Sequence, residues 1–177
     1  VYSISEIDPT PGYDLTDLSC FDSNTQQTFQ GDLSTRAVSF TPEPGHTIAC
    51  TFVNRARGKI VINKSVQPPG GSEVFSFTND IETPALFNLS DGGTKQFPDI
   101  QAGQYTVEEL VGGADTRLAA ITCADSASNG VPSAGDPATA RATINLDPGE
   151  TVECTFVNAE NDTVIIQKRT DPPGDTT

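Results

Sequence analysis

The sequence predicts an all-β protein, and three observations support that prediction. Short segments rich in Val, Ile, Thr, Tyr and Phe alternate with clusters of Gly, Pro, Asn, Asp and Ser, as in strands joined by turns. Helical periodicity is hard to find anywhere in the 177 residues. An internal repeat of about 104 residues has the size of one small β-sandwich.

The repeat appears when the chain is compared with itself. Residues 44–70, PGHTIACTFVNRARGKIVINKSVQPPG, return as residues 148–174, PGETVECTFVNAENDTVIIQKRTDPPG. YSISEI, starting at Tyr2, returns as YTVEEL, starting at Tyr105. Because the repeat is far longer than a solenoid unit, we expect tandem immunoglobulin-like β-sandwich domains, each with its own core.

The chain is out of register with these units. Residues 1–54 match the second half of a unit, residues 59–158 make one complete unit, and residues 163–177 match the start of another. Because the chain begins at Val1, we expect a processed or excised piece. It is either a fragment of a longer tandem protein or a subunit whose ends are completed by neighbouring copies, head to tail. The leading half-unit is expected to need structure from outside this chain.

Composition excludes several partners. The 24 acidic and 10 basic residues give a net charge of -14, which repels phosphate backbones and anionic lipid head groups. No apolar run reaches the roughly 18 residues of a membrane helix, and no signal-peptide pattern opens the chain. We therefore expect no nucleic-acid partner and no membrane insertion of this segment.

The four cysteines fall in two repeated pairs. Cys20 with Cys50, and Cys123 with Cys154, occupy equivalent places in successive units, which favours one disulfide inside each domain. Pairing across units would break the repeat symmetry. A zinc site would require ligands that are closer together in the sequence and more than one histidine. Closing a loop of about 30 residues stabilises a domain by about 3–4 kcal/mol. Disulfides indicate an oxidising, extracellular compartment.

Three sequons agree with export. NKS at Asn63, NLS at Asn88 and NDT at Asn161 are candidate glycan acceptors. Such triplets also arise often by chance, so the sequence leaves glycosylation open.

A lysine stands on a strand face that is otherwise apolar. In KIVINKSV, residues 59–66, a two-residue period puts Lys64 on the same face as Ile60, Ile62 and Val66. A buried ammonium costs several kcal/mol unless another group pairs with it, neutralises it or reacts with it. The pattern therefore predicts that another polar or charged side chain lies beside Lys64 in the core.

A carboxylate and an amide occupy similar positions on other strands. Glu109 follows Val107 on one face of YTVEEL, and Asn158 follows Phe156 on one face of CTFVN. The partial units repeat all three polar positions, at Lys168, Glu6 and Asn54. Lysine, glutamate and asparagine thus recur where core residues are expected.

These motifs together resemble a known family. A strand lysine, then AGQYTVEE, then a last strand ending in CTFVN is similar to the prealbumin-like domains of bacterial surface proteins, close to collagen-adhesin B-type and pilin repeats. The resemblance covers essentially the whole chain and implies modules of stalks and fibres. It also implies a spontaneous Lys-Asn isopeptide bond, with Lys64 as nucleophile, Glu109 as proton shuttle and Asn158 as electrophile. The disulfide in each unit departs from the usual pattern of those domains.

The proposed chemistry has a physical basis of its own. Burial lowers the pKa of a lysine and raises that of a carboxyl group, so a neutral amine and a protonated acid can coexist. A neutral amine is a nucleophile, and the acid would polarise the amide carbonyl and pass the proton that lets ammonia leave. The alternative is a buried Lys-Glu ion pair with Asn hydrogen-bonded beside it.

Other candidates give weaker signals. His46 lies in the turn-like segment PEPGHT and is expected to be a solvated loop residue. Because it is the single histidine and all four cysteines are expected to be paired, a Cys-His nucleophile is disfavoured. DSASNG, residues 125–130, and DGG, residues 91–93, offer oxygen atoms but lack EF-hand spacing, so no metal is expected. The Gly-Gly pairs at 70–71, 92–93 and 112–113 are interpreted as turns.

The sequence therefore favours an extracellular structural protein that forms a stalk, fibre or filament on a microbial surface, without cofactor or enzymatic activity. Its expected partners are neighbouring repeats or other copies. A ligand-binding adhesin module is the alternative, although 3 Tyr, 9 Phe and no Trp leave few residues for an aromatic patch.

Overall fold

The computed structural model describes residues 1–110, 116–126, 130–161 and 164–169. All regular elements in these ranges are β-strands, which confirms the all-β prediction. The described residues contain no helix long and apolar enough to cross a membrane. The strands are β1 (Tyr2–Ser5), β2 (Tyr13–Asp22), β3 (Gln27–Gln30), β4 (Ala37–Phe40), β5 (Ile48–Ala56), β6 (Gly58–Gln67), β7 (Val74–Asn79), β8 (Leu86–Ser90), β9 (Thr94–Ile100), β10 (Gly103–Glu109), β11 (Thr116–Asp125), β12 (Ala134–Asp136), β13 (Arg141–Leu146) and β14 (Thr151–Glu160).

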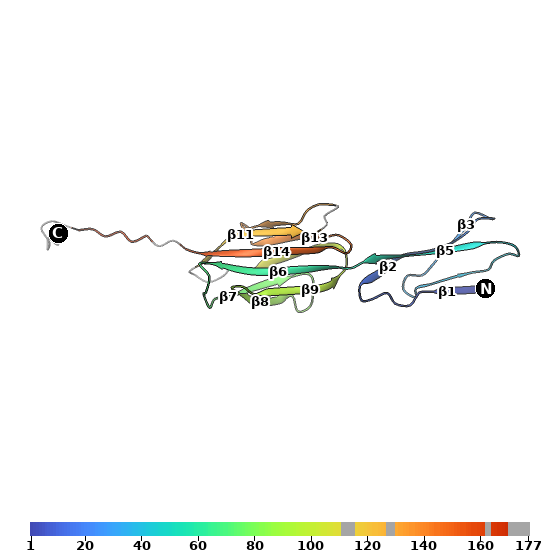
Figure 1. The fold of residues 1–177 in the computed structure, drawn as a ribbon, viewed down its shortest axis with the longest axis horizontal. Helices are drawn as coiled ribbons and strands as arrows, with labels where there is room; N and C mark the ends of the chain where they lie inside the picture. The colour runs from blue at the N-terminus through green and yellow to red at the C-terminus, as the bar shows by residue number, and fades with distance from the viewer. Residues whose placement is uncertain (111–115, 127–129, 162–163, 170–177) are drawn as a thin grey trace.

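Residues 58–160, here called the C-terminal part, form a two-sheet β-sandwich (Figure 1). One sheet has the order β12-β13-β10-β7-β8 and the other β11-β14-β6-β9. Strands β6 and β14 run parallel in the centre of the second sheet. Alternating apolar residues on both sheets make one core, which includes the fully buried side chains of Ile60, Ile62, Phe75, Phe77, Phe97 and Phe156.

Residues 1–56, here called the N-terminal part, form a two-stranded sheet β1-β4 and a three-stranded sheet β3-β2-β5. Their smaller core is centred on Leu18, Cys20 and Val38. The strand pairs β1-β4 and β2-β5 reproduce the antiparallel pairs β10-β13 and β11-β14. Even the register shift after Leu15 recurs, after Leu118. The repeat seen in the sequence is therefore a repeat of strand pairing.

Each part of the chain has one disulfide. Cys20 is joined to Cys50, and Cys123 is joined to Cys154. In both pairs the two cysteines stand directly opposite one another on neighbouring antiparallel strands. The structure therefore has the pairing within units that the repeat favours, and the described residues include no free cysteine.

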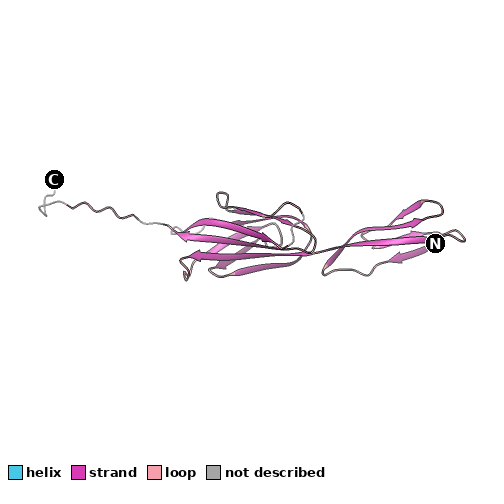
Figure 2. Ribbon diagram, turned by 45° about the horizontal axis from the view of Figure 1, so that its top comes forward, coloured by secondary structure: helices cyan, strands magenta, loops and turns pink. Residues whose placement is uncertain are grey.

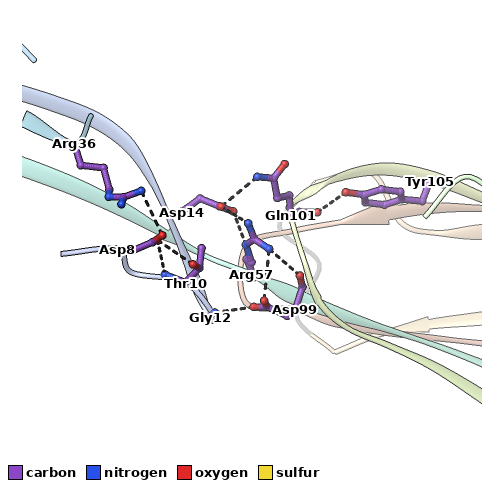
Figure 3. A network of polar contacts seen from close by, with 9 residues as sticks. All are labelled: Asp8, Thr10, Gly12, Asp14, Arg36, Arg57, Asp99, Gln101 and Tyr105. Atoms are coloured by element: carbon purple, nitrogen blue, oxygen red, sulfur yellow. Dashed lines mark hydrogen bonds and ion pairs between the residues drawn. The ribbon is translucent and has the colours of Figure 1, made fainter. Parts of the chain in front are cut away.

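A polar network joins the two parts (Figure 3). Only Arg57 separates β5 from β6, and its guanidinium donates to both carboxylate oxygens of Asp14, at 2.6 and 3.0 Å. The same guanidinium contacts Asp99 Oδ2 at 3.5 Å, while Gly12 N donates to Asp99 Oδ1 at 2.7 Å. A bidentate Arg-carboxylate pair fixes orientation as well as distance. The junction is thus a short strand continuation supported by charge pairs, and the two parts lie end to end (Figure 2).

Candidate cross-link site

Lys64 lies in the middle of β6, with its side chain inside the sandwich. Only 2% of the residue is exposed, because it shares the inward face of the strand with Ile62 and Val66. Its Nζ lies over the ring of Phe75, 4.1 Å from the centroid. Lys64 therefore lies on the buried face of β6, the face to which the two-residue period assigns it.

Glu109 and Asn158 reach the same place from two other strands. Glu109 ends β10 in the opposite sheet and is 3% exposed, whereas Asn158 lies on β14 beside β6 and is 1% exposed. The sheets bring together residues separated by 49 and 94 positions in the chain. All three polar residues singled out in the complete unit thus meet in one buried cluster.

The three side chains are in direct contact. Lys64 Nζ donates a hydrogen bond to Asn158 Oδ1 at 2.8 Å, and Asn158 Nδ2 donates to Glu109 Oε1 at 2.8 Å. Glu109 Oε2 lies 3.7 Å from Lys64 Nζ. One carboxyl group therefore faces the lysine nitrogen with one oxygen and the amide nitrogen with the other.

This contact pattern differs in one respect from the expected roles. The sequence-based hypothesis has Glu109 polarising the amide carbonyl of Asn158. In the structure the carbonyl oxygen accepts its hydrogen bond from Lys64, and Glu109 faces the amide nitrogen instead. The carboxyl group therefore contacts the amide nitrogen of Asn158 and not its carbonyl oxygen.

Burial shifts both ionisable groups toward their neutral forms. Desolvation is the largest influence on Lys64 and lowers its pKa, although the nearby charge of Glu109 opposes this shift. Desolvation likewise raises the pKa of Glu109, against the hydrogen bond from Asn158 and the charge of Lys64. A neutral amine and a protonated carboxyl group are the forms that these directions favour.

Backbone carbonyl groups hold the lysine nitrogen in place. Lys64 Nζ also donates to the carbonyl oxygens of Ser65 at 3.0 Å and Phe156 at 3.3 Å. Sequence reasoning did not identify these acceptors, because they are main-chain atoms and carry no residue-type signal. They fix the position of the lysine nitrogen beside Asn158.

A cavity of about 320 Å³ adjoins the cluster. Glu109 and Asn158 form the wall of the cavity on the side of the cluster. Its other walls come from β11 and the turn before β13, at Thr116, Arg117, Leu118, Pro137, Ala138 and Ala140. The amide end of the cluster therefore borders open space.

The N-terminal part contains the equivalent acid and amide. Asn54 Nδ2 donates to Glu6 Oε1 at 2.6 Å, as Asn158 does to Glu109. Lys168, which the repeat assigns to such a cluster, lies in the exposed segment 164–169. Figures 1 and 2 show that this segment and β1 lie at opposite ends of the molecule. One chain therefore does not bring Lys168 to Glu6 and Asn54.

The three sequon asparagines differ in their surroundings. Asn63 is half-buried on β6, donates to Glu153 and accepts from Thr94 Oγ1 at 2.8 Å. Asn88 is exposed on β8, and Asn161 is exposed after β14. Asn88 and Asn161 are therefore the two exposed sequon asparagines, and glycosylation stays a prediction.

His46 is not the solvated loop residue that its sequence context suggests. It lies in a turn, but its side chain is only 17% exposed and its Nδ1 lies 2.9 Å from Asp22 Oδ2. No local pattern predicts this contact, because Asp22 ends β2 whereas His46 lies in the turn before β5.

An acidic side chain in one of the candidate loops accepts hydrogen bonds from backbone amides. Asp91 accepts from the amides of Val66 at 2.8 Å and Gly70 at 3.1 Å. Within the described ranges no group of three or more His, Cys, Asp or Glu residues could hold a metal ion. Residues 127–129 of DSASNG and the Gly-Gly pair at 112–113 lie outside the described residues.

Comparison with known proteins gives one family. The family model described as a prealbumin-like fold domain matches residues 1–56 and 60–160. The comparison with curated proteins finds no match.

Three solved structures are similar to the chain. A bacterial adhesin from Mobiluncus mulieris, described as containing intramolecular disulfide, isopeptide and ester bond cross-links, is 18% identical, with a TM-score of 0.43. The alignment covers 76% of this chain and 48% of that adhesin, so the chain spans about half of its length.

The other two structures are pilins. A major pilin of Streptococcus pyogenes is 13% identical (TM-score 0.42; 90% of this chain and 66% of that one), and a minor pilin of Streptococcus agalactiae is 9% identical (TM-score 0.43; 94% and 91%).

Proposed function

Because the chain belongs to the prealbumin-like fold domain family, we propose that it is an extracellular structural segment of a microbial surface stalk, fibre or pilus. Its domains are proposed to form a tandem array, with residues 59–158 as one complete unit. The observation that carries this proposal is the buried Lys64-Glu109-Asn158 cluster, which has the composition and contacts needed for an isopeptide bond.

The reaction joins Lys64 Nζ to Asn158 Cγ and releases ammonia. Once Lys64 has lost a proton, two hydrogens remain for the backbone acceptors, and the neutral amine gives up its hydrogen bond to Oδ1 and attacks the amide carbon, which is one bond away from the oxygen that Nζ contacts at 2.8 Å. Glu109 gives its proton to Nδ2, 2.8 Å from Oε1, and takes a proton from Nζ through Oε2. The Cγ-Nδ2 bond then breaks. Nothing is oxidised or reduced, and the carboxyl group ends as it began.

The folded core supplies most of the catalysis. It holds amine, amide and acid within contact distance, so a bimolecular reaction becomes an intramolecular one, an effect that is worth up to about 7–11 kcal/mol in favourable cases. The cavity that borders Asn158 and Glu109 gives the ammonia a way out. Because the reaction consumes its own amine, it occurs once in each domain and is a maturation step.

The position of the bond suits a protein under tension. Force enters the C-terminal part through β6, its first strand, and leaves through β14, its last (Figure 1). A Lys64-Asn158 bond joins these two neighbouring strands directly. Of the 94 positions between them, 31 are closed off by the Cys123-Cys154 disulfide, and the remaining positions could otherwise extend by about 210 Å, at about 3.3 Å each. The bond would carry the load while the sandwich stays folded.

Intact mass separates the covalent cluster from the ion pair. The wild-type chain is expected to be about 17 Da lighter than its disulfide-bonded composition, because one ammonia is lost. Glu109→Gln preserves size and the contact with Asn158 but cannot shuttle a proton, so its mass should lack this deficit, as should that of Glu109→Ala. Glu108→Gln on the exposed side of β10 is the matched control and should keep the deficit. A wild-type mass without the deficit would leave the ion pair as the correct interpretation.

A further inference from the structure

The cavity beside the buried cluster gives a second route to the reacting amide. Its inner wall is formed by the buried residues Glu109 and Asn158, whereas Arg117 and Ala138 in its other walls are exposed. Lys64 is not among the described residues that line it. The cavity therefore extends from the surface to the amide and the carboxyl group, while Lys64 reaches the same amide from inside the sandwich.

The carboxyl group in the cavity wall has one oxygen without a hydrogen bond. Glu109 Oε1 accepts from Asn158 Nδ2 at 2.8 Å, whereas Oε2 is buried and has no hydrogen-bond partner among the described residues. Lys64 Nζ lies 3.7 Å from Oε2, which is too long for a hydrogen bond. Buried acceptors without a partner are rare in proteins. Oε2 thus has an acceptor position left for a small molecule that reaches Glu109 from the cavity.

The lining of the cavity favours small, uncharged molecules. Its volume of about 320 Å³ holds several molecules of the size of water, each of which takes up about 30 Å³ in the liquid. Glu109 and Asn158 supply hydrogen-bonding atoms at its inner end, and Leu118 and Ala138 supply apolar walls. Arg117 adds a positive charge to the wall, which disfavours protonated amines.

Ammonia is a molecule of this kind, and the proposed cross-linking reaction releases it at Asn158. A catalytic group that assists a step in one direction also assists its reverse, through the same arrangement of atoms. The acid that protonates departing ammonia can therefore take a proton from an amine that arrives from the same side. An amine in the cavity is thus placed to attack Asn158 Cγ with the help of Glu109.

We propose that the cavity beside Glu109 and Asn158 is a binding site for small neutral amines, which take over the acyl group of Asn158. With hydroxylamine, a bond forms between its nitrogen and Cγ, the Cγ-Nδ2 bond breaks, and ammonia leaves. Glu109 gives a proton to Nδ2 through Oε1 and receives one from hydroxylamine through Oε2. The side chain ends as a hydroxamate, and nothing is oxidised or reduced. This inference rests on the proposed function, because it uses the same acid and the same amide.

Lys64 decides which amine reacts. Its Nζ is held 2.8 Å from Asn158 Oδ1, and well-oriented intramolecular groups reach effective molarities of about 10⁵–10⁸ M. Hydroxylamine at about 0.1 M is therefore at a disadvantage of about 10⁶-fold or more. The wild-type chain should keep its Lys64-Asn158 bond, whereas a chain without this lysine should react with hydroxylamine.

Intact mass of the full chain in hydroxylamine at neutral pH tests the proposal, because hydroxylamine is mostly uncharged there. Lys64→Met should become about 16 Da heavier, and peptide mapping should place the addition at Asn158. The wild-type chain should gain no mass. The double variant Lys64→Met and Glu109→Gln should react at least about 100-fold more slowly, because proton transfer by Glu109 is lost. Asn24, which is exposed, is the internal control and should stay unmodified.

A second measurement keeps Lys64 and so does not depend on the folding of Lys64→Met. Ala138→Phe puts a ring into the cavity wall from an exposed turn, and Ala124→Phe, exposed on β11 and outside the lining, is the matched control. In refolding chains, Ala138→Phe should slow the loss of about 17 Da, because departing ammonia passes through the cavity. Ala124→Phe should leave the rate of this loss unchanged.

The outcomes separate this inference from the proposed function. A folded Lys64→Met chain that gains no mass, beside a wild-type chain with the deficit of about 17 Da, would overturn the amine site and leave the cross-link standing. Addition at Asn158 in Lys64→Met, beside a wild-type chain without the deficit, would support the amine site and overturn the cross-link. Equal addition at Asn24 and Asn158, or an unchanged rate in Ala138→Phe, would overturn the role of the cavity.

Discussion

Replacing both charges of the buried cluster separates a cross-link from an ion pair through the sign and size of the stability change. The double variant Lys64→Met and Glu109→Gln keeps the shapes of both side chains and leaves no unpaired charge in the core. A buried ion pair replaced in this way is often neutral or stabilised by about 1–4 kcal/mol. A cross-link lost in this way removes a constraint on the unfolded chain, so the change must be destabilising.

The loop that the bond closes sets the size of the effect. Lys64 and Asn158 are 94 positions apart, and a loop of that length corresponds to about 4–5 kcal/mol in the chain-entropy model. The Cys123-Cys154 disulfide lies within this loop and shortens its free path, which lowers the figure by only a few tenths of a kcal/mol. For a domain of about 100 residues, 4 kcal/mol corresponds to a fall in melting temperature of about 16–30 °C.

Calorimetry of the disulfide-bonded chain would measure this effect, because it can resolve the transition of the C-terminal part. The same double substitution in the partly exposed pair Lys95 and Glu82, whose charged atoms are 2.6 Å apart, is the matched control. It should change the unfolding free energy by less than about 1 kcal/mol. A loss below about 2 kcal/mol in the buried double variant, the size of one broken buried hydrogen bond, would refute the covalent reasoning.

Three further predictions concern pH, the disulfide and the junction. In chains refolded from denaturant, the rate of the 17 Da loss should depend on pH as a bell-shaped curve. Protonation of Lys64 slows the reaction on the acid side, and the lowered pKa of Lys64 extends the reactive range to lower pH. Ionisation of Glu109 slows the reaction on the alkaline side, and the raised pKa of Glu109 extends the reactive range to higher pH. A rate that only rises with pH would exclude an acid role for Glu109. Replacing Cys123 and Cys154 by Ala opens a loop of 31 residues and should lower the unfolding free energy by about 3–4 kcal/mol; chemical denaturation showing a change below about 1 kcal/mol would contradict this estimate. Arg57→Ala should broaden the distribution of distances between the two parts in a spin-label experiment while changing stability by less than about 1 kcal/mol, and an unchanged distribution would show that strand continuity alone holds the junction.

Strand faces and cysteine pairs could be predicted from the sequence because both depend on local periodicity. The two-residue period separates inward from outward side chains, so Lys64, Glu109 and Asn158 stand out as polar residues on apolar faces. The internal repeat adds a second, independent sign, because the same residue types recur about 104 positions away. Together these signs identify the cluster without any knowledge of the neighbouring strands.

The contacts around these residues could not be predicted in the same way. Periodicity gives the face of a strand but not its partner, so the parallel pairing of β6 with β14 appears only in the structure. Which oxygen of Glu109 faces which nitrogen depends on side-chain rotamers and on the opposite sheet. His46 on Asp22, and Arg57 on Asp14, are pairs between elements that no local pattern connects.

Tandem mass spectrometry of a tryptic digest tests the central claim most directly. Trypsin cleaves after a free lysine but not after one whose amine has become an amide. A Lys64-Asn158 bond therefore predicts a branched peptide that contains the uncleaved Lys64-Ser65 bond, joined to the peptide of Asn158, with a mass about 17 Da below the sum of the two. Two separate linear peptides, one ending at Lys64 and one with an intact Asn158 amide, would contradict the cross-link.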